Sequence, residues 1–129
     1  MAAEEGAGTE ERAELAGGGQ WFQLYHVEPG DTLWGIARWW YGRPDEIYWR
    51  RIWLANRRLI GPNPHLIRSS QWLRLPYSGF SYHIEPGDTL SQLAEWVYED
   101  GDWSRIHNAN PWIQDPNQIQ VSWWIWIPG

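Results

Sequence analysis

Two pairs of carboxylates have a spacing that suggests acid–base chemistry. Glu28 and Asp31 lie three positions apart, and Glu85 and Asp88 repeat this arrangement. A glycosidase uses two carboxyl groups about 5–10 Å apart across a cleft. Each pair here, however, encloses a Pro-Gly dipeptide and precedes a threonine, which is typical of a turn that leads into a capped helix. We therefore expect these carboxylates to be structural.

The remaining candidates for catalysis or metal binding carry weaker signals. The four histidines include no pair with a metal-ligand spacing such as H-E-x-x-H. Cysteine is absent, so neither a disulfide nor thiol chemistry is available. No serine lies in a nucleophile elbow, and no glycine-rich phosphate loop occurs. The sequence predicts no catalytic residue, no metal site and no cofactor, and we expect the chain not to be an enzyme.

The carboxylate pairs belong to a longer segment that occurs twice. The sequence YHVEPGDTL at residues 25–33 returns as YHIEPGDTL at residues 82–90. The similarity continues through a Trp-x-Arg-Ile segment, an Ala-Asn dipeptide and a Ser-x-Trp segment, in the same order in both copies. Such self-similarity marks one structural unit that is used two times.

Each unit predicts the order strand, helix, helix, strand. A short run rich in β-branched and aromatic residues ends at Pro-Gly, and apolar residues at helical spacing follow an Asp-Thr cap. The predicted elements are strand 23–28, helix 32–41, a helix from Pro44-Asp45 and strand 72–75, then strand 80–85, helix 89–98, a helix from Gly101-Asp102 and strand 124–127. The predicted fold class is α+β, with two tandem βααβ units, each a two-stranded antiparallel sheet with both helices on one face.

These motifs resemble the LysM domain. The family pattern is a Gly-Asp-Thr-Leu turn, an Ile-Ala helix, a Trp-x-x-Ile helix that ends in Ala-Asn, and a final strand that ends in Ile-Pro. The chain carries nearly all of this pattern twice. The resemblance implies LysM units at residues 21–76 and 82–129, joined by a linker at residues 77–81.

One dipeptide departs from the family pattern in both units. The family usually has Gly-Gln just before the last strand, where this chain has Ser70-Gln71 and Ser122-Trp123. Glycine adopts a positive φ at low cost and serine does not. We therefore expect that turn to be strained or differently shaped.

The resemblance implies non-catalytic binding of N-acetylglucosamine polymers, with peptidoglycan or chitin as the partner. In the family the ligand lies between the first strand–helix loop and the loop after the second helix. The corresponding residues are Gly30, Asp31, Thr32, Leu33, Leu59 and Ile60 in the first unit, and Gly87, Asp88, Thr89, Leu90, Pro111, Trp112 and Ile113 in the second. Backbone groups of the turn can form hydrogen bonds with the N-acetyl amide. Leucine and isoleucine can contact its methyl group, and Trp112 can pack on a sugar face.

Tryptophan suggests an alternative function. The chain has 13 tryptophans, more than two small cores require. Exposed apolar patches mark contacts, and tryptophan is enriched at interfaces. Four positions are expected to be exposed on an isolated unit: Trp39, Trp96, Trp124 and Trp126. The alternative is a structural assembly protein with other protein subunits as partners, and the resemblance implies a setting for it in phage tails or baseplates of contractile injection machines.

The net charge of −6 is unevenly distributed. Residues 25–76 carry eight arginines and four acidic residues, whereas residues 82–128 carry one arginine and seven acidic residues. Phosphate binding requires a sustained basic field, so we expect no nucleic-acid partner.

The first 20 residues differ in composition from the rest. Residues 1–20 consist mainly of Ala, Gly and Glu, which predicts a flexible acidic tail. The sequence given shows neither a secretory signal nor a membrane-spanning run. We expect no membrane partner, a cytoplasmic location at synthesis, and a final place in the cell wall or in a phage-like particle.

Overall fold

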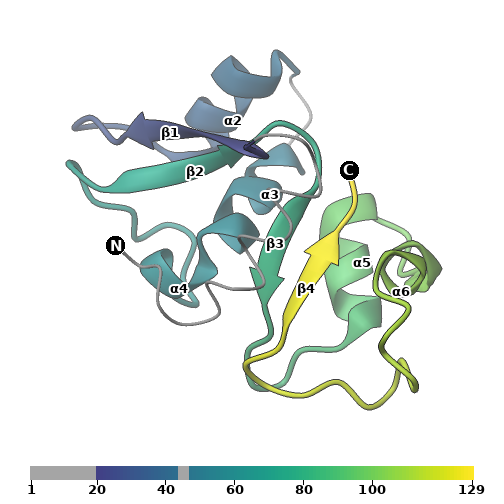
Figure 1. Cartoon of the computed structure of the whole chain (residues 1–129). Helices are drawn as coiled ribbons and strands as arrows, with labels where there is room; N and C mark the ends of the chain where they lie inside the picture. Colours follow the sequence, from purple (N-terminus) through teal and green to yellow (C-terminus); the bar gives the residue numbers. More distant parts are fainter. Residues whose placement is uncertain (1–19, 44–46) are drawn as a thin grey trace. The chain divides into compact units, whose positions relative to one another are not determined.

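The computed structural model describes residues 20–43 and 47–129, which form two compact units (Figure 1). The first contains residues 22–77 and the second residues 78–129, together with Trp21. We call these the first and second repeat and describe each by itself. The predicted acidic tail lies outside the described residues, apart from Gln20.

The first repeat has two strands and three helices in its described part. These are β1 (Phe22–His26), α2 (Leu33–Tyr41), α3 (Tyr48–Ala55), α4 (Arg57–Ile60) and β2 (Trp72–Pro76). The strands pair antiparallel, with Phe22 opposite Pro76 and His26 opposite Trp72. The pairing of first and last strand confirms the predicted topology.

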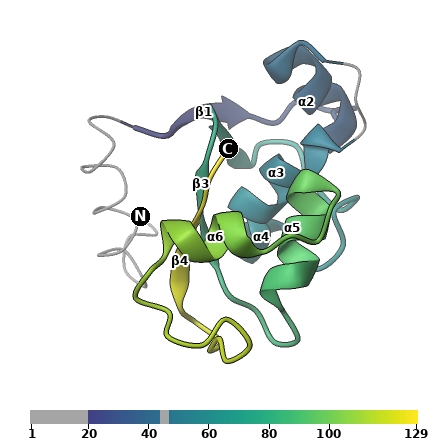
Figure 2. The same cartoon turned by 90° about the vertical axis from the view of Figure 1, so that its right-hand side faces the viewer.

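The second repeat has the same order without the extra short helix. Its elements are β3 (Phe80–His83), α5 (Leu90–Tyr98), α6 (Ser104–Ala109) and β4 (Trp124–Ile127). β3 and β4 pair antiparallel, with Phe80 opposite Ile127 and His83 opposite Trp124. Figures 1 and 2 show α5 and α6 on the same side of this strand pair. The predicted α+β class, with helices on one face, is therefore confirmed.

Apolar periodicity builds both cores. On β4, Ile125 and Ile127 are buried while Trp124 and Trp126 are half-buried, because successive side chains of a strand point to opposite faces. On α2 and α5 the buried positions recur at helical spacing and form one apolar stripe, whereas α3 buries three consecutive residues. The buried helical residues are Leu33, Ile36, Ala37, Ile52, Trp53 and Leu54 in α2 and α3, and Leu90, Leu93, Ala94, Val97 and Ile106 in α5 and α6.

Apart from shifts of one residue, the boundaries differ from those expected in the first strands and in the second helix of the second repeat. Both first strands end two residues earlier than predicted, at His26 and His83. In the second repeat the helix begins at Ser104, because Asp102 Oδ1 accepts hydrogen bonds from the Ser104 N–H and hydroxyl, 3.0 and 2.7 Å long. In the first repeat α3 begins at Tyr48, and the predicted start at residues 44–45 lies outside the described residues.

Helix α4 was predicted to be a loop, which is wrong. The carbonyl of Asn56 accepts from the N–H groups of Leu59 and Ile60, and the N–H of Gly61 donates to Arg57, which closes one helical turn. Four residues are too few for helical periodicity to show in a window of about 11–18 residues. A proline-rich loop follows α4, and its composition makes the whole segment between α3 and β2 look like a loop in the sequence.

Candidate functional site

The repeated Gly-Asp turn has nearly the same geometry in both repeats. Gly30 has a φ of +90° and Gly87 a φ of +88°, a backbone conformation that side chains with a Cβ rarely adopt. The Asp31 carboxylate then folds back over the turn. Its Oδ2 accepts from the Tyr25 hydroxyl at 2.7 Å and from the Glu28 N–H at 2.8 Å.

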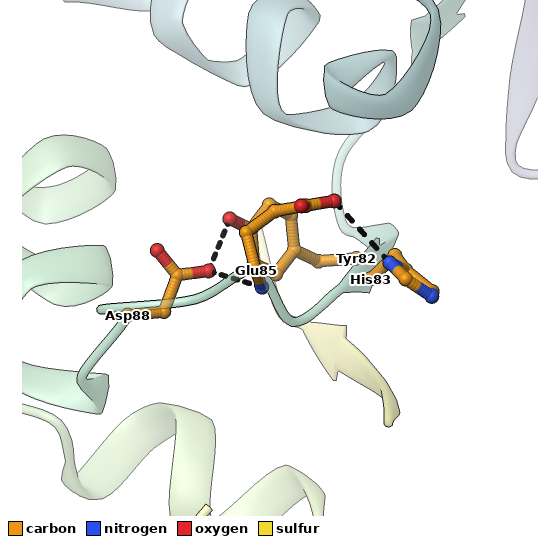
Figure 3. A network of polar contacts seen from close by, with 4 residues as sticks. All are labelled: Tyr82, His83, Glu85 and Asp88. Atoms are coloured by element: carbon orange, nitrogen blue, oxygen red, sulfur yellow. Dashed lines mark hydrogen bonds and ion pairs between the residues drawn. The ribbon is translucent and has the colours of Figure 1, made fainter. Parts of the chain in front are cut away.

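Figure 3 shows the same network in the second repeat. Asp88 Oδ2 accepts from the Tyr82 hydroxyl at 2.6 Å and from the Glu85 N–H at 2.8 Å. Glu85 in turn contacts His83, whose Nδ1 lies 3.3 Å from Glu85 Oε2. Each aspartate therefore fixes the strand–helix turn, which agrees with the structural role expected for the carboxylate pairs.

The threonine that follows each aspartate caps a helix. Thr32 Oγ1 accepts from the Gly35 N–H, and Thr89 Oγ1 from the Gln92 N–H, both at 3.0 Å. Such a bond satisfies one of the N–H groups that a helix leaves open at its start. The predicted caps are confirmed, and they fix where the turn ends and the helix begins.

Asp31 also changes the acidity of its tyrosine partner. The hydrogen bond to Asp31 is the main cause that raises the pKa of Tyr25 to about 12, with partial burial and the negative charge adding to it. The hydroxyl therefore stays protonated further into the alkaline range and keeps donating to the carboxylate there. The turn is thereby tied to strand β1.

A buried asparagine joins the second helix to the last strand. In the first repeat, Asn56 Nδ2 donates to the carbonyls of Ile52 and Arg74, while the Arg74 N–H donates to Asn56 Oδ1. Asn110 forms the corresponding bonds with Ile106 and Trp126. The loop that starts after each asparagine therefore leaves from a fixed point beside the sheet.

The turn before the last strand also belongs to the candidate site in each repeat. Ser70 has a φ of 74° and Ser122 a φ of 81°, so both serines occupy the left-handed conformation that favours glycine. The N–H of Ser70 donates to the Val27 carbonyl, and that of Ser122 to the Ile84 carbonyl. These bonds place the loop next to the start of the Gly-Asp-Thr turn. The positive φ values agree with the expectation that this turn is strained or differently shaped.

The loop after α6 presents the exposed ring of Trp112. Trp112 is 51% exposed, Pro111 is exposed, and Ile113 is buried with its carbonyl 2.7 Å from His107 Nε2. The Trp112 ring lies 5.1 Å from the ring of Trp123 at an angle of 67°. The Trp123 carbonyl accepts from the Ile84 N–H, so this pair connects the loop to the strand that leads into the turn.

The predicted glycan-binding residues separate into a buried and an accessible group. The aliphatic side chains expected to meet a methyl group are core residues: Leu33, Ile60, Leu90 and Ile113. At the surface lie the two glycines, the two threonines, Pro111, Trp112 and Leu59, and Leu59 is 53% exposed. The two aspartates are half-buried and committed to their turns. The assignment of these positions to a ligand stays a prediction.

The four tryptophans predicted to form an interface differ in exposure. Trp39 is 65% exposed, whereas Trp96, Trp124 and Trp126 are half-buried. Trp124 lies against His83, with ring centroids 4.9 Å apart. Their role as an interface stays a prediction.

Within residues 20–43 and 47–129, no group of three His, Asp or Glu side chains is arranged to hold a metal ion. Over the same residues no helix has the length and apolar character needed to span a bilayer.

Comparison with known proteins identifies the class of domain. The LysM domain family model matches residues 25–76 and again residues 82–128. The chain therefore belongs to the LysM family and carries two copies of the domain. Domains of this family are binding modules that generally bind glycans containing N-acetylglucosamine.

Among solved structures, the chain is similar to the spore cortex-lytic enzyme SleL of Bacillus megaterium QM B1551, with 27% identity and a TM-score of 0.34. The match covers 84% of this chain and 23% of the SleL chain. No curated protein matches the chain. These comparisons give no support to the phage-tail or baseplate setting.

Proposed function

We propose that the chain is a non-catalytic binding protein for a polysaccharide that contains N-acetylglucosamine, either peptidoglycan or chitin. The observation that carries this proposal is the double LysM match together with the Gly-Asp-Thr turn built twice from equivalent hydrogen bonds. The carboxylate that a glycosidase would need free is occupied by that turn. Binding is therefore the function that these residues support best.

The accessible groups around the turn suit an N-acetylated sugar. The N-acetyl group offers an amide donor and a carbonyl acceptor, and the sugar ring offers an apolar face of C–H groups. Gly87 and Thr89 are exposed residues of the turn, and we assign the contact with the amide to their backbone. The half-exposed ring of Trp112, supported by Trp123, is available for the sugar face. In the first repeat Leu59 supplies a smaller apolar surface from helix α4.

Two sites on one chain suit a repetitive ligand. Each surface is small, so a single repeat should bind weakly. When both repeats reach the same polymer, the second contact becomes intramolecular, and overall affinity can rise by about 10²–10⁴. The proposal therefore favours long polymers over short oligomers as ligands.

Co-sedimentation with insoluble peptidoglycan and with chitin tests the proposal. The chain should be retained by at least one of them and released by soluble N-acetylglucosamine oligomers. No reducing sugar should appear during the incubation. Loss of retention on both materials would refute binding, and release of reducing sugar would refute the non-catalytic part.

A second candidate function is assembly with other protein subunits. The charge imbalance favours it, because the first repeat has an excess of arginine and the second an excess of acidic residues. A contact between unlike surfaces is heterologous and builds rings or filaments. Light scattering across protein concentration and salt tests this candidate, since the electrostatic part should weaken as salt rises. A chain that stays monomeric at high concentration and low salt would refute it.

A further inference from the structure

Four aromatic rings form a continuous row in the first repeat. They belong to Tyr25, Trp39, Trp40 and Tyr77, and we call them the aromatic row. Successive ring centroids lie 5.6, 5.9 and 5.5 Å apart, and successive planes are tilted by 46°, 40° and 43°. The rings come from β1, from α2 and from the residue directly after β2.

The row is accessible at Trp39 and Tyr77, and hydrogen bonds hold its two partly buried members, Tyr25 and Trp40. Trp39 is 65% exposed and Tyr77 is 55% exposed. The Trp40 indole N–H donates to the Pro76 carbonyl at 2.9 Å, and the Tyr25 hydroxyl donates to Asp31 at 2.7 Å. A fixed ring loses little conformational entropy when a ligand stacks on it, so Tyr25 and Trp40 are preorganised for binding.

The second repeat folds without such a row. The position of Trp40 is held by Val97, which is buried, and the position of Tyr77 by Gly129. Tyr82, the counterpart of Tyr25, is fully buried, and Trp96, the counterpart of Trp39, is half-buried. Since the same fold forms without the exposed rings, the row is not required for folding. Exposed apolar surface beyond the needs of the fold marks a contact site.

We propose that the aromatic row is an additional sugar-binding subsite of the first repeat, which stacks successive residues of a β-linked N-acetylhexosamine chain. The inference rests on the proposed glycan-binding function and extends it to a surface outside the two predicted loops. The row begins at Tyr25, which is bonded to Asp31 of the Gly-Asp-Thr turn, so it is continuous with the proposed site.

Spacing and chemistry favour a sugar chain over a protein surface here. The steps between rings are close to the advance per residue of an extended β-linked glycan. Tyrosine and tryptophan offer an apolar face with a polar rim, which suits a ligand with apolar C–H faces and hydroxyl edges.

Calorimetry with a chitin hexamer, on the full chain, tests the proposal. Trp39→Ala should weaken binding at least about fivefold, as is typical for an aromatic contact residue. Trp39→Phe should retain most of the affinity, because it keeps a ring face. Trp96→Ala, the counterpart in the second repeat, is the matched control and should change affinity less than twofold. Thermal unfolding and light scattering on each variant report folding and self-association.

Each result decides the matter. Loss of binding in the folded Trp39→Ala variant, with Trp96→Ala unaffected, supports the subsite. Unchanged affinity in Trp39→Ala overturns the subsite and leaves the proposed function standing. A variant that binds normally but self-associates less would show that the row contacts another copy, which also overturns it. If the wild-type chain binds neither the hexamer nor the insoluble polymers, both the subsite and the proposed function fail.

Discussion

The side-chain amide of Asn110 pairs with the backbone of Trp126 in both directions. Asn110 Nδ2 donates to the Trp126 carbonyl at 2.7 Å, and the Trp126 N–H donates to Asn110 Oδ1 at 2.8 Å. Asn56 holds Arg74 in the same way, with both bonds 2.8 Å long. A two-stranded sheet leaves open backbone groups along its edges. The asparagine satisfies one pair of them, as a neighbouring strand would.

Removing this amide should destabilise the second repeat strongly. Asn110 is buried, and its Nδ2 also donates to the Ile106 carbonyl at 2.8 Å. Asn110→Ala deletes three hydrogen bonds and leaves buried backbone groups unsatisfied, so it should lower the free energy of unfolding by about 3 kcal/mol. Asn110→Asp keeps the shape but cannot donate, and it should cost at least as much. Urea unfolding measures both.

The control for this prediction lies on the same helix. Asn108 is exposed, and Asn108→Ala should change stability by less than about 0.5 kcal/mol. Equal stability of Asn108→Ala and Asn110→Ala would contradict the stabilising role assigned to the Asn110 hydrogen bonds.

Glycine should stabilise the turn before each last strand. Ser70 and Ser122 have positive φ values, and the left-handed conformation costs a residue with a Cβ about 1–2 kcal/mol. Glycine loses more entropy on folding, which offsets part of this gain. Ser70→Gly and Ser122→Gly should each raise the free energy of unfolding by about 0.5–1 kcal/mol in denaturant titrations.

Ser69→Gly is the neighbouring control. Ser69 does not have a positive φ, so glycine there should be neutral or destabilising. Destabilisation by the glycines at 70 and 122 would show that their side chains stabilise the turn in a way that outweighs the strain.

Tyr25 should make stability depend on pH in the alkaline range. Its pKa is raised from 10.0 to about 12, so the folded chain holds the phenol proton more tightly than the unfolded chain. The resulting stabilisation is present in full below pH 10 and is lost as the pH rises from 10 to about 12. Thermal midpoints across this range should fall less steeply for Tyr25→Phe than for the wild type.

Tyr25→Phe should also lower stability at neutral pH by about 1 kcal/mol, because it removes a hydrogen bond to a carboxylate at a half-buried site. Tyr77→Phe is the comparison, since its hydroxyl forms only a 3.3 Å contact with Gln23 at the surface. Equal alkaline slopes for the wild type and Tyr25→Phe would contradict the assigned origin of the pKa shift.

Trp112 should matter for binding and little for folding. Its side chain is half-exposed, and Trp112→Ala removes the ring offered to the sugar while leaving the hydrogen bonds between Asn110 and Trp126 intact. Retention on the polysaccharide should fall at least about fivefold, with the thermal midpoint nearly unchanged. Leu66→Ala, which removes an exposed apolar residue outside the predicted site, should retain wild-type binding. Equal retention of Trp112→Ala and the wild type would remove Trp112 from the site.

Local sequence predicted the parts of the structure that depend on local chemistry. Thr32 and Thr89 were expected to cap helices, and each accepts the bond of a cap. Ser70 and Ser122, in the place of a family glycine, were expected to be strained and have positive φ. In such cases the type of a residue and its immediate neighbours determine the backbone conformation.

Features that depend on tertiary packing could not be predicted from the local sequence. Leu33 and Leu90 follow the turn in sequence and were assigned to the ligand, but helical rotation places both in the core. The hydrogen bond from Tyr25 to Asp31 leaves a trace in the sequence, because Tyr82 and Asp88 repeat the same residues at the same spacing. A repeated spacing alone, however, does not indicate a hydrogen bond. The Trp112–Trp123 pair joins two segments whose approach depends on the fold of the whole loop.

The central claim is that a glycan meets the two Gly-Asp-Thr turns, and an amide NMR titration tests it most directly. The ¹⁵N-labelled full chain is titrated with a soluble N-acetylglucosamine oligomer. The account predicts that the backbone amides of Gly30, Thr32, Gly87 and Thr89 shift in a saturable way, together with the indole signal of Trp112. Spectra in which these signals stay in place at saturating oligomer would contradict it.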